Sequence, residues 1–117
     1  MKEVTVILSP EAEEVYNYLV SEAEHSKIEK SILNSFEKKK ELVKANAHYG
    51  EPIAKDKIPN EYKKKYGVTN LFCVVLSNFW RMLYTLTNNE TEVKIIAFVL
   101  DIMDHKKYDK KFGYKGH

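Results

Sequence analysis

The chain has 117 residues, of which 44% are hydrophobic, and a formal net charge of +2 at pH 7. This length and composition predict one globular domain, residues 1–117, with a single core. The single cysteine excludes an internal disulfide and is typical of a reducing compartment. No apolar run approaches the roughly 20 residues of a membrane span, and the N-terminus lacks a signal peptide's apolar stretch. We therefore expect a cytoplasmic protein.

The first elements in chain order are a short strand over residues 4–8 and a helix over residues 10–24. The helix start is indicated by Ser9, a capping hydroxyl, followed by Pro10 at the first helical position. Apolar residues then recur at the three-four spacing of one buried helical face.

A second helix is expected over residues 27–48, beginning at the capping box formed by Ser26 and Glu29. Gly50 is expected to end it in a left-handed conformation. Because the junction between the two helices is short, they should pack as an antiparallel hairpin. Residues 50–69 follow as a connector, in which residues 61–65 can form one helical turn.

The second half of the chain predicts three strands, over residues 70–77, 80–87 and 93–102, with a turn at residues 88–91. The first is apolar on both faces, which is typical of a strand in the middle of a covered sheet, so Cys73 is read as a small core residue. Strand, two helices and three strands together predict a two-layer α+β domain: a helical hairpin on a mostly antiparallel sheet that the three-strand meander completes.

The positive charge is concentrated in the second half of the chain. Residues 1–50 carry nine acidic and seven basic side chains, whereas residues 51–117 carry eight acidic and twelve basic ones. Lysine clusters interleaved with aromatic residues suit a polyanion, because lysine meets phosphate and rings stack on bases. A lysine-rich solvated surface is the alternative interpretation. The lysines nominated for RNA are Lys55, Lys57, Lys63, Lys64, Lys65, Lys106 and Lys107.

Three residues are candidates for catalysis. Arg81, the only arginine, stands on a predicted strand, where its planar guanidinium is a rigid fork suited to phosphate; a surface ion pair is the alternative. His105 directly follows the last predicted strand, and Tyr108 lies three residues on. These are the parts needed for RNA cleavage by the 2′-hydroxyl, which requires a base, positive charge on the phosphate and an acid. For His105 and Tyr108, the alternative interpretation is that they belong to a charged, disordered tail. No metal-ligand spacing or cofactor motif is present in the sequence, so we expect neither a metal nor a cofactor.

Four segments carry a resemblance to a known family: residues 50–53 (GEPI), 66–71 (YGVTNL), 80–85 (WRMLYT) and the tail at residues 104–115. With this element order, the chain resembles the RelE/ParE toxin superfamily of type II toxin–antitoxin systems, in particular its RelE-like mRNA interferases. The resemblance covers nearly the whole chain. It implies an endoribonuclease that cleaves mRNA on the ribosome, inhibits translation and is held inactive by a cognate antitoxin.

The resemblance also implies roles for individual residues. Arg81 matches the strand arginine that contacts phosphate, His105 the basic or imidazole position after the last strand, and Tyr108 the tail tyrosine that stacks on or orients the substrate. Some family members use a glutamate as base, and either Glu51 or Glu61 could correspond to it. Relatives of the ParE type share the fold but inhibit DNA gyrase without cutting RNA. Such an inhibitor and an inert, antitoxin-binding member therefore stay open as alternatives.

Overall fold

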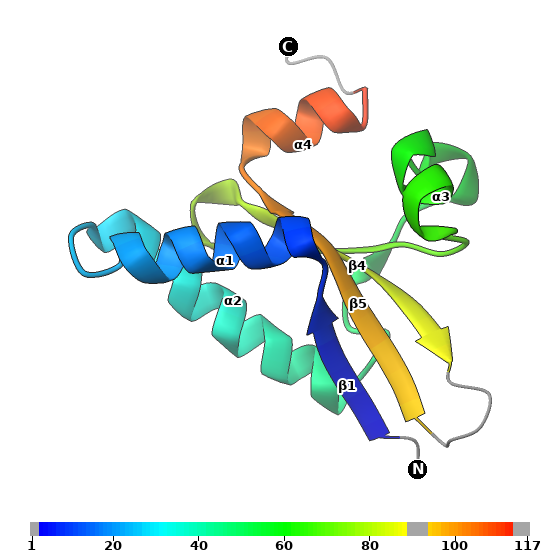
Figure 1. Ribbon diagram of the computed structural model, residues 1–117, viewed down its shortest axis with the longest axis horizontal. Helices are drawn as coiled ribbons and strands as arrows, with labels where there is room; N and C mark the ends of the chain where they lie inside the picture. Colours follow the sequence, from blue (N-terminus) through cyan, green and yellow to red (C-terminus); the bar gives the residue numbers. More distant parts are fainter. Residues whose placement is uncertain (1–2, 89–93, 114–117) are drawn as a thin grey trace.

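The computed structural model of the protein describes residues 3–88 and 94–113. Within them lies one five-stranded sheet in the order β1–β5–β4–β3–β2, in which β1 runs parallel to β5 and every other pair is antiparallel. Figure 1 labels β1, β5 and β4 of this sheet together with the four helices. The elements in chain order are β1 (Glu3–Leu8), α1 (Pro10–Glu22), α2 (Lys27–Ala45), β2 (Glu51–Pro52), the 3-10 turn η1 (Lys55–Lys57), α3 (Asn60–Tyr66), β3 (Phe72–Val75), the 3-10 turn η2 (Ser77–Phe79), β4 (Arg81–Asn88), β5 (Lys94–Met103) and α4 (His105–Lys111).

The predicted α+β architecture is confirmed. The helices α1 and α2 form a hairpin that packs on one face of the sheet, and β3, β4 and β5 form the antiparallel meander. The sheet has two features that the periodicity did not predict: the two-residue strand β2 at one edge, and the parallel pairing of β1 with β5 at the other. The expected helical turn in the connector is also present, as α3.

Both long helices begin where their capping residues predict. The side chain of Ser9 accepts a hydrogen bond from the amide of Ala12 at 3.0 Å and donates one to the carbonyl of Leu100 at 2.7 Å. The first bond satisfies an amide that has no partner within the helix, and the second ties the start of α1 to β5. The side chain of Ser26 likewise accepts from the amide of Glu29 at 3.4 Å and starts α2.

The predicted role of Gly50 as a left-handed helix cap is wrong. The helix α2 ends at Ala45, three residues earlier than expected, with Asn46 extended after it, and the described glycines with positive φ are Gly67 and Gly113. Gly50 is instead needed for close approach. A Cβ atom there would lie 3.0 Å from Cε1 of Tyr84, and the Gly50 amide donates to the Tyr84 hydroxyl at 2.9 Å.

Two hydrophobic clusters cover the two faces of the sheet. The larger lies under the α1–α2 hairpin and contains Leu19, Phe36, Met82, Tyr84 and Val99 among its buried residues. The second lies beneath α3 and α4, and its buried residues are Ile58, Tyr62, Val68, Leu71, Leu83, Leu100 and Met103. Because α3 and α4 are short, this second cover is incomplete and leaves part of the sheet open.

The strand predicted over residues 70–77 is shorter than expected. It spans only Phe72–Val75. It ends at Val75 because the Leu76 amide bonds to the Trp80 carbonyl at 2.8 Å and closes the turn η2. The prediction that both its faces are covered is also wrong, because Val75 is 53% exposed. Cys73, on the same face, is half-buried rather than a core residue.

Part of the predicted organisation lies outside the described residues, including positions 89–91 of the expected turn and the tail beyond residue 113. No helix in the described part of the chain is long and apolar enough to cross a membrane.

Candidate functional site

Arg81 is held in place from several sides. It begins β4, where it pairs with Val75 of β3 and with Met103 of β5. Its Nη1 atom donates a hydrogen bond of 2.5 Å to the carbonyl of Phe79, a residue with a φ of +61°. A guanidinium anchored on a central strand and on the adjoining turn has little freedom to reorient, as a preorganised anion contact requires.

Tyr108 packs on this arginine. The helix α4 begins directly after β5, and the Asp104 side chain caps it by accepting from the Lys107 amide at 2.8 Å. One turn further on, the Tyr108 ring centroid lies 5.1 Å from Cζ of Arg81, within the range of a cation–π contact. The structure therefore brings together two of the three residues that the sequence nominated for catalysis.

These two side chains line a groove of about 390 Å³ on the incompletely covered face of the sheet. We call it the Arg81 groove; its lining residues are Glu51, Pro52, Ile53, Ala54, Lys57, Cys73, Val75, Arg81 and Tyr108. The lining combines two cations, Lys57 and Arg81, and one carboxylate, Glu51, with apolar side chains. These residues come from β2, η1, β3, β4 and α4 and from the segment between β2 and η1. Burial raises the pKa of the Cys73 thiol, so this group is neutral at pH 7.

His105 lies beside the Arg81 groove but does not line it. It is the first residue of α4; its side chain is 56% exposed and its Nε2 atom lies 3.2 Å from Oδ2 of Asp109. Its ring faces that of Phe79 at a centroid distance of 6.3 Å, and Phe79 accepts the hydrogen bond from Arg81. Phe79 thus contacts both the His105 imidazole, through its ring, and the Arg81 guanidinium, through its carbonyl.

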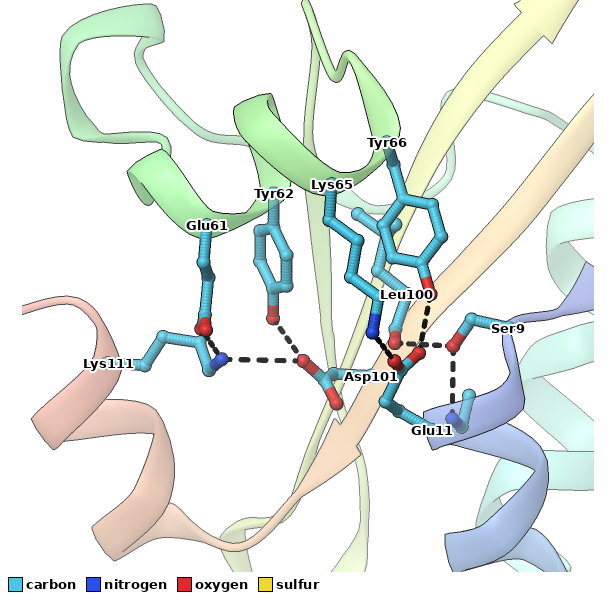
Figure 2. Close-up of polar contacts among 10 residues, drawn as sticks. Ser9, Glu11, Glu61, Tyr62, Lys65, Tyr66, Leu100, Asp101 and Lys111 are labelled. Atoms are coloured by element: carbon cyan, nitrogen blue, oxygen red, sulfur yellow. Dashed lines mark hydrogen bonds and ion pairs between the residues drawn. The ribbon is translucent and has the colours of Figure 1, made fainter.

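The two glutamates that could serve as a base are separated. Glu51 lines the Arg81 groove, whereas Glu61, on α3, forms an ion pair with Lys111 of α4 (Figure 2). Of the two, only Glu51 is near Arg81 and Tyr108.

A polar cluster ties α3 and α4 to the sheet, and we call it the Asp101 cluster: Glu61, Tyr62, Asp101 and Lys111 (Figure 2). The Tyr62 hydroxyl donates to Asp101 Oδ2 at 2.6 Å, and Lys111 Nζ lies 3.7 Å from the same oxygen. Burial raises the pKa of Asp101 and of Tyr62 and lowers that of Lys111. The cluster lies outside the Arg81 groove but holds in place the helix that carries Tyr108.

Asp101 is not among the residues that the sequence predicted for a functional site. A register shift between Leu83 and Tyr84 puts Leu83 opposite Asp101 and Tyr84 opposite Val99, so Leu100 has no partner on β4. Such an extra residue re-aims its neighbours, and Asp101 points toward α3 (Figure 2). The signal was available, because Asp101 is the only carboxylate in β5 and interrupts an apolar run.

The lysines nominated for RNA fall into different environments. Lys57 lines the Arg81 groove, and Lys55 and Lys63 border a hollow of about 470 Å³ between η1 and the end of α3. Lys64, Lys106 and Lys107 are exposed.

Lys65 differs from the other nominated lysines, because it forms an ion pair with Glu11 of α1 (Figure 2). Glu11 also accepts a hydrogen bond of 2.5 Å from the Tyr66 hydroxyl. The Lys65 ammonium, and to a smaller extent the hydrogen bond from Tyr66, lower the pKa of Glu11 to about 2. Lys65 therefore joins α3 to α1 in the free protein.

Within residues 3–88 and 94–113, no three His, Cys, Asp or Glu side chains converge as metal ligands would. Comparison with protein-family models finds no match for this sequence, and comparisons with curated proteins and with solved structures find none either.

Proposed function

We propose that the protein is a RelE-like toxin of a type II toxin–antitoxin system, an endoribonuclease that cleaves mRNA on the ribosome and so inhibits translation. The observation that carries the proposal is the cation–π contact between Arg81 and Tyr108 in an open groove that also holds Lys57 and Glu51. Together they supply positive charge for a phosphate, a carboxylate that can accept a proton and a tyrosine that can orient the substrate.

The reaction that fits these groups is attack by the RNA 2′-hydroxyl on the adjacent phosphate. A base removes the hydroxyl proton, the new O–P bond closes a 2′,3′-cyclic phosphate, and an acid protonates the departing 5′-oxygen. Arg81 stabilises the negative charge that builds on the phosphate. Tyr108 orients the substrate rather than stacking on a nucleobase, because Phe112 stacks on its ring at a centroid distance of 4.5 Å and Arg81 lies over the ring. Glu51 and His105 are the groups available for proton transfer at the groove and beside it.

The proposal includes a partner. A toxin of this class requires a cognate antitoxin, and an amphipathic helix or added strand would cover its active surface. Co-expression with a small protein encoded next to this gene should give a complex that purifies together and relieves toxicity. Failure of every neighbouring product to bind would count against this part of the proposal.

Induced expression of Arg81 variants, followed by mapping of cellular RNA ends, tests the proposed activity. Arg81→Ala should lower cleavage on the order of a hundredfold or more, because the charge on the phosphate is no longer stabilised. Arg81→Lys should rescue only partly, since lysine lacks the planar fork. Circular dichroism of each purified variant controls for folding.

If the Arg81→Ala protein is folded and stays fully toxic, the proposal that the protein acts by RNA cleavage is wrong. DNA damage on expression, without new RNA ends, would instead favour a non-enzymatic inhibitor of DNA gyrase. An absence of toxicity in the wild-type protein would favour an inert, antitoxin-binding member.

A further inference from the structure

A second groove, separate from the Arg81 groove, runs along α2. It has a volume of about 530 Å³, and we call it the α2 groove; its lining residues are Lys27, Lys30, Ser31, Asn34, Ser35, Lys38, Lys39 and Ser77. All but Ser77 belong to α2, at the three-four spacing of one helical face. The Ser77 amide donates to the Ser35 hydroxyl at 3.1 Å and so joins η2 to the helix here.

The lysines of the α2 groove are not neutralised. Lys27, Lys30 and Lys38 are exposed, and none of them has a carboxylate partner among the described residues. The remaining lysine, Lys39, contacts Tyr49, with its Nζ atom 3.2 Å from the tyrosine hydroxyl. No carboxylate lines the groove within the described part of the chain.

Two other lysines of α2 are paired with acids. Lys40 lies 3.0 Å from Glu37 and Lys44 lies 3.3 Å from Glu41. None of these four residues lines the α2 groove. The excess of acidic over basic residues in residues 1–50 conceals this basic face, because a count along the sequence averages over all sides of the helix.

The lining indicates what the α2 groove binds. A protein partner would be expected to find an apolar centre, and no apolar side chain lines this groove among the described residues. Lysine, serine and asparagine are residues that contact phosphates in nucleic acids. From Lys27 to Lys38 the helix rises by about 16 Å, which suits a line of phosphates rather than a single one. The described lining also holds no aromatic ring on which unpaired bases could stack.

We propose that the α2 groove binds the sugar–phosphate backbone of a base-paired RNA. Double-stranded RNA is recognised mainly by shape and backbone contacts, which a row of lysines and hydroxyls can make without reading bases. The turn η2 connects the two grooves, since Ser77 lines the α2 groove and Phe79 accepts the hydrogen bond from Arg81. The inference rests on the proposed function to the extent that the helical RNA flanks a single strand held in the Arg81 groove.

The test is binding of a fluorescent RNA hairpin with a fully paired stem, over a series of salt concentrations. The full chain is used with Arg81→Ala, so that the probe is not cut. In this background, Lys30→Gln/Lys38→Gln removes two unpaired lysines of the α2 groove. The matched control, Lys40→Gln/Lys44→Gln, removes the same charge from two lysines of the same helix that are ion-paired and do not line the groove.

We expect Lys30→Gln/Lys38→Gln to weaken hairpin binding roughly tenfold or more at about 0.1 M salt and to reduce the slope of log K against log salt by about 2. The control should change neither. Equal weakening in both variants would mean that net charge alone acts, and would overturn the inference, as would unchanged binding in Lys30→Gln/Lys38→Gln. Loss of affinity for a polyglutamate peptide, with hairpin affinity retained, would overturn it in favour of an acidic protein partner.

Hairpin binding is measured without cleavage, so this inference and the proposed function fail separately. A wild-type protein that does not cut RNA, but whose hairpin binding depends on Lys30 and Lys38, would reject the nuclease and retain the α2 groove as an RNA site.

Discussion

The hydroxyl of Tyr62 donates a hydrogen bond of 2.6 Å to Oδ2 of Asp101, and this contact joins α3 to the sheet beside the point where α4 begins. Lys111, from α4, approaches the same oxygen at 3.7 Å. One carboxylate of β5 therefore positions both short helices. Because α4 also carries Tyr108 over Arg81, the geometry of the Arg81 groove depends on a contact outside it.

Replacing Tyr62 with phenylalanine should destabilise the protein by about 1–3 kcal/mol, because Asp101 loses its hydrogen-bond donor while staying half-buried. Urea denaturation measures the effect. Tyr18→Phe is the control, since Tyr18 is 50% exposed and has no hydrogen-bond partner among the described residues. Hydrogen exchange in α4 should rise in Tyr62→Phe and not in the control. Unchanged stability would mean that this contact is not made in solution.

A larger residue at position 50 should be costly. In Gly50→Ala the new Cβ would lie 3.0 Å from Cε1 of Tyr84 and 3.1 Å from Cβ of Phe72. Crowding of this kind costs about 1–3 kcal/mol in a packed interior. The free energy of unfolding in urea checks the value.

The Tyr84 hydroxyl bonds to both the Ala47 carbonyl, at 2.8 Å, and the Gly50 amide. Tyr84→Phe should therefore destabilise the protein on its own, while removing one of the atoms that would crowd a methyl group at position 50. We expect the Gly50→Ala/Tyr84→Phe double variant to be more stable than the sum of the single effects predicts. Strict additivity would show that the added methyl group is accommodated without contact with the hydroxyl.

The Glu11–Lys65 pair should make stability depend on acid pH. The pKa of Glu11 is about 2 in the folded protein against 4.5 for a free glutamate. Since the folded pKa is the lower one, the contribution is complete above about pH 4.5 and is lost as the pH falls toward 2. Added salt should weaken it, because the pair lies at the surface.

Urea midpoints of the wild type and of Glu11→Gln between pH 2 and 6 check this dependence. The two curves should differ at pH 6 and converge at pH 2. Glu13→Gln is the control, because Glu13 lies on the same helix and has no ion pair among the described residues. A constant difference between wild type and Glu11→Gln across the range would contradict the assignment.

The three consecutive lysines of α3 should not contribute equally to RNA binding. Replacing Lys63, Lys64 and Lys65 together by alanine should weaken RNA binding and reduce its salt dependence. Most of this effect should appear in Lys63→Ala/Lys64→Ala, with a slope reduced by about 2, because Lys65 is already paired with Glu11. An unchanged slope in the triple variant would mean that this run is only a solvated face.

Substitutions of His105 and of Tyr108 should have different effects on the cleavage rate and on RNA binding. His105→Ala should slow cleavage more than it weakens RNA binding if the imidazole moves a proton. Tyr108→Ala should weaken RNA binding more than it slows cleavage if the tyrosine orients the bound RNA. Single-turnover rates and binding constants, measured with the same RNA, distinguish the two. If His105→Ala cleaves at the wild-type rate, Glu51→Gln becomes the variant to measure, since Glu51 lines the Arg81 groove.

Much of the fold could be predicted because its signals are local. Ser9 and Ser26 each cap the helix that follows them, and helical or alternating spacing marks the buried face of α1, α2 and β4. The failures concern residues whose role depends on distant partners. Gly50 was predicted to be a helix cap, but Tyr84, thirty-four positions later, lies so close to it that position 50 has no room for a side chain. Cys73 read as core, yet the short helices α3 and α4 leave its face of the sheet partly open.

The candidate site divides in the same way. By itself the sequence determined the residue types and their elements: one arginine on a strand, and a histidine and a tyrosine just beyond another. Only the tertiary structure decided that Tyr108 packs on Arg81, that Glu51 rather than Glu61 lies in their groove, and that Lys65 is paired with Glu11. The physical reason is that strand pairing and helix docking bring together residues far apart in the chain, and spacing along the sequence carries no information about such distances.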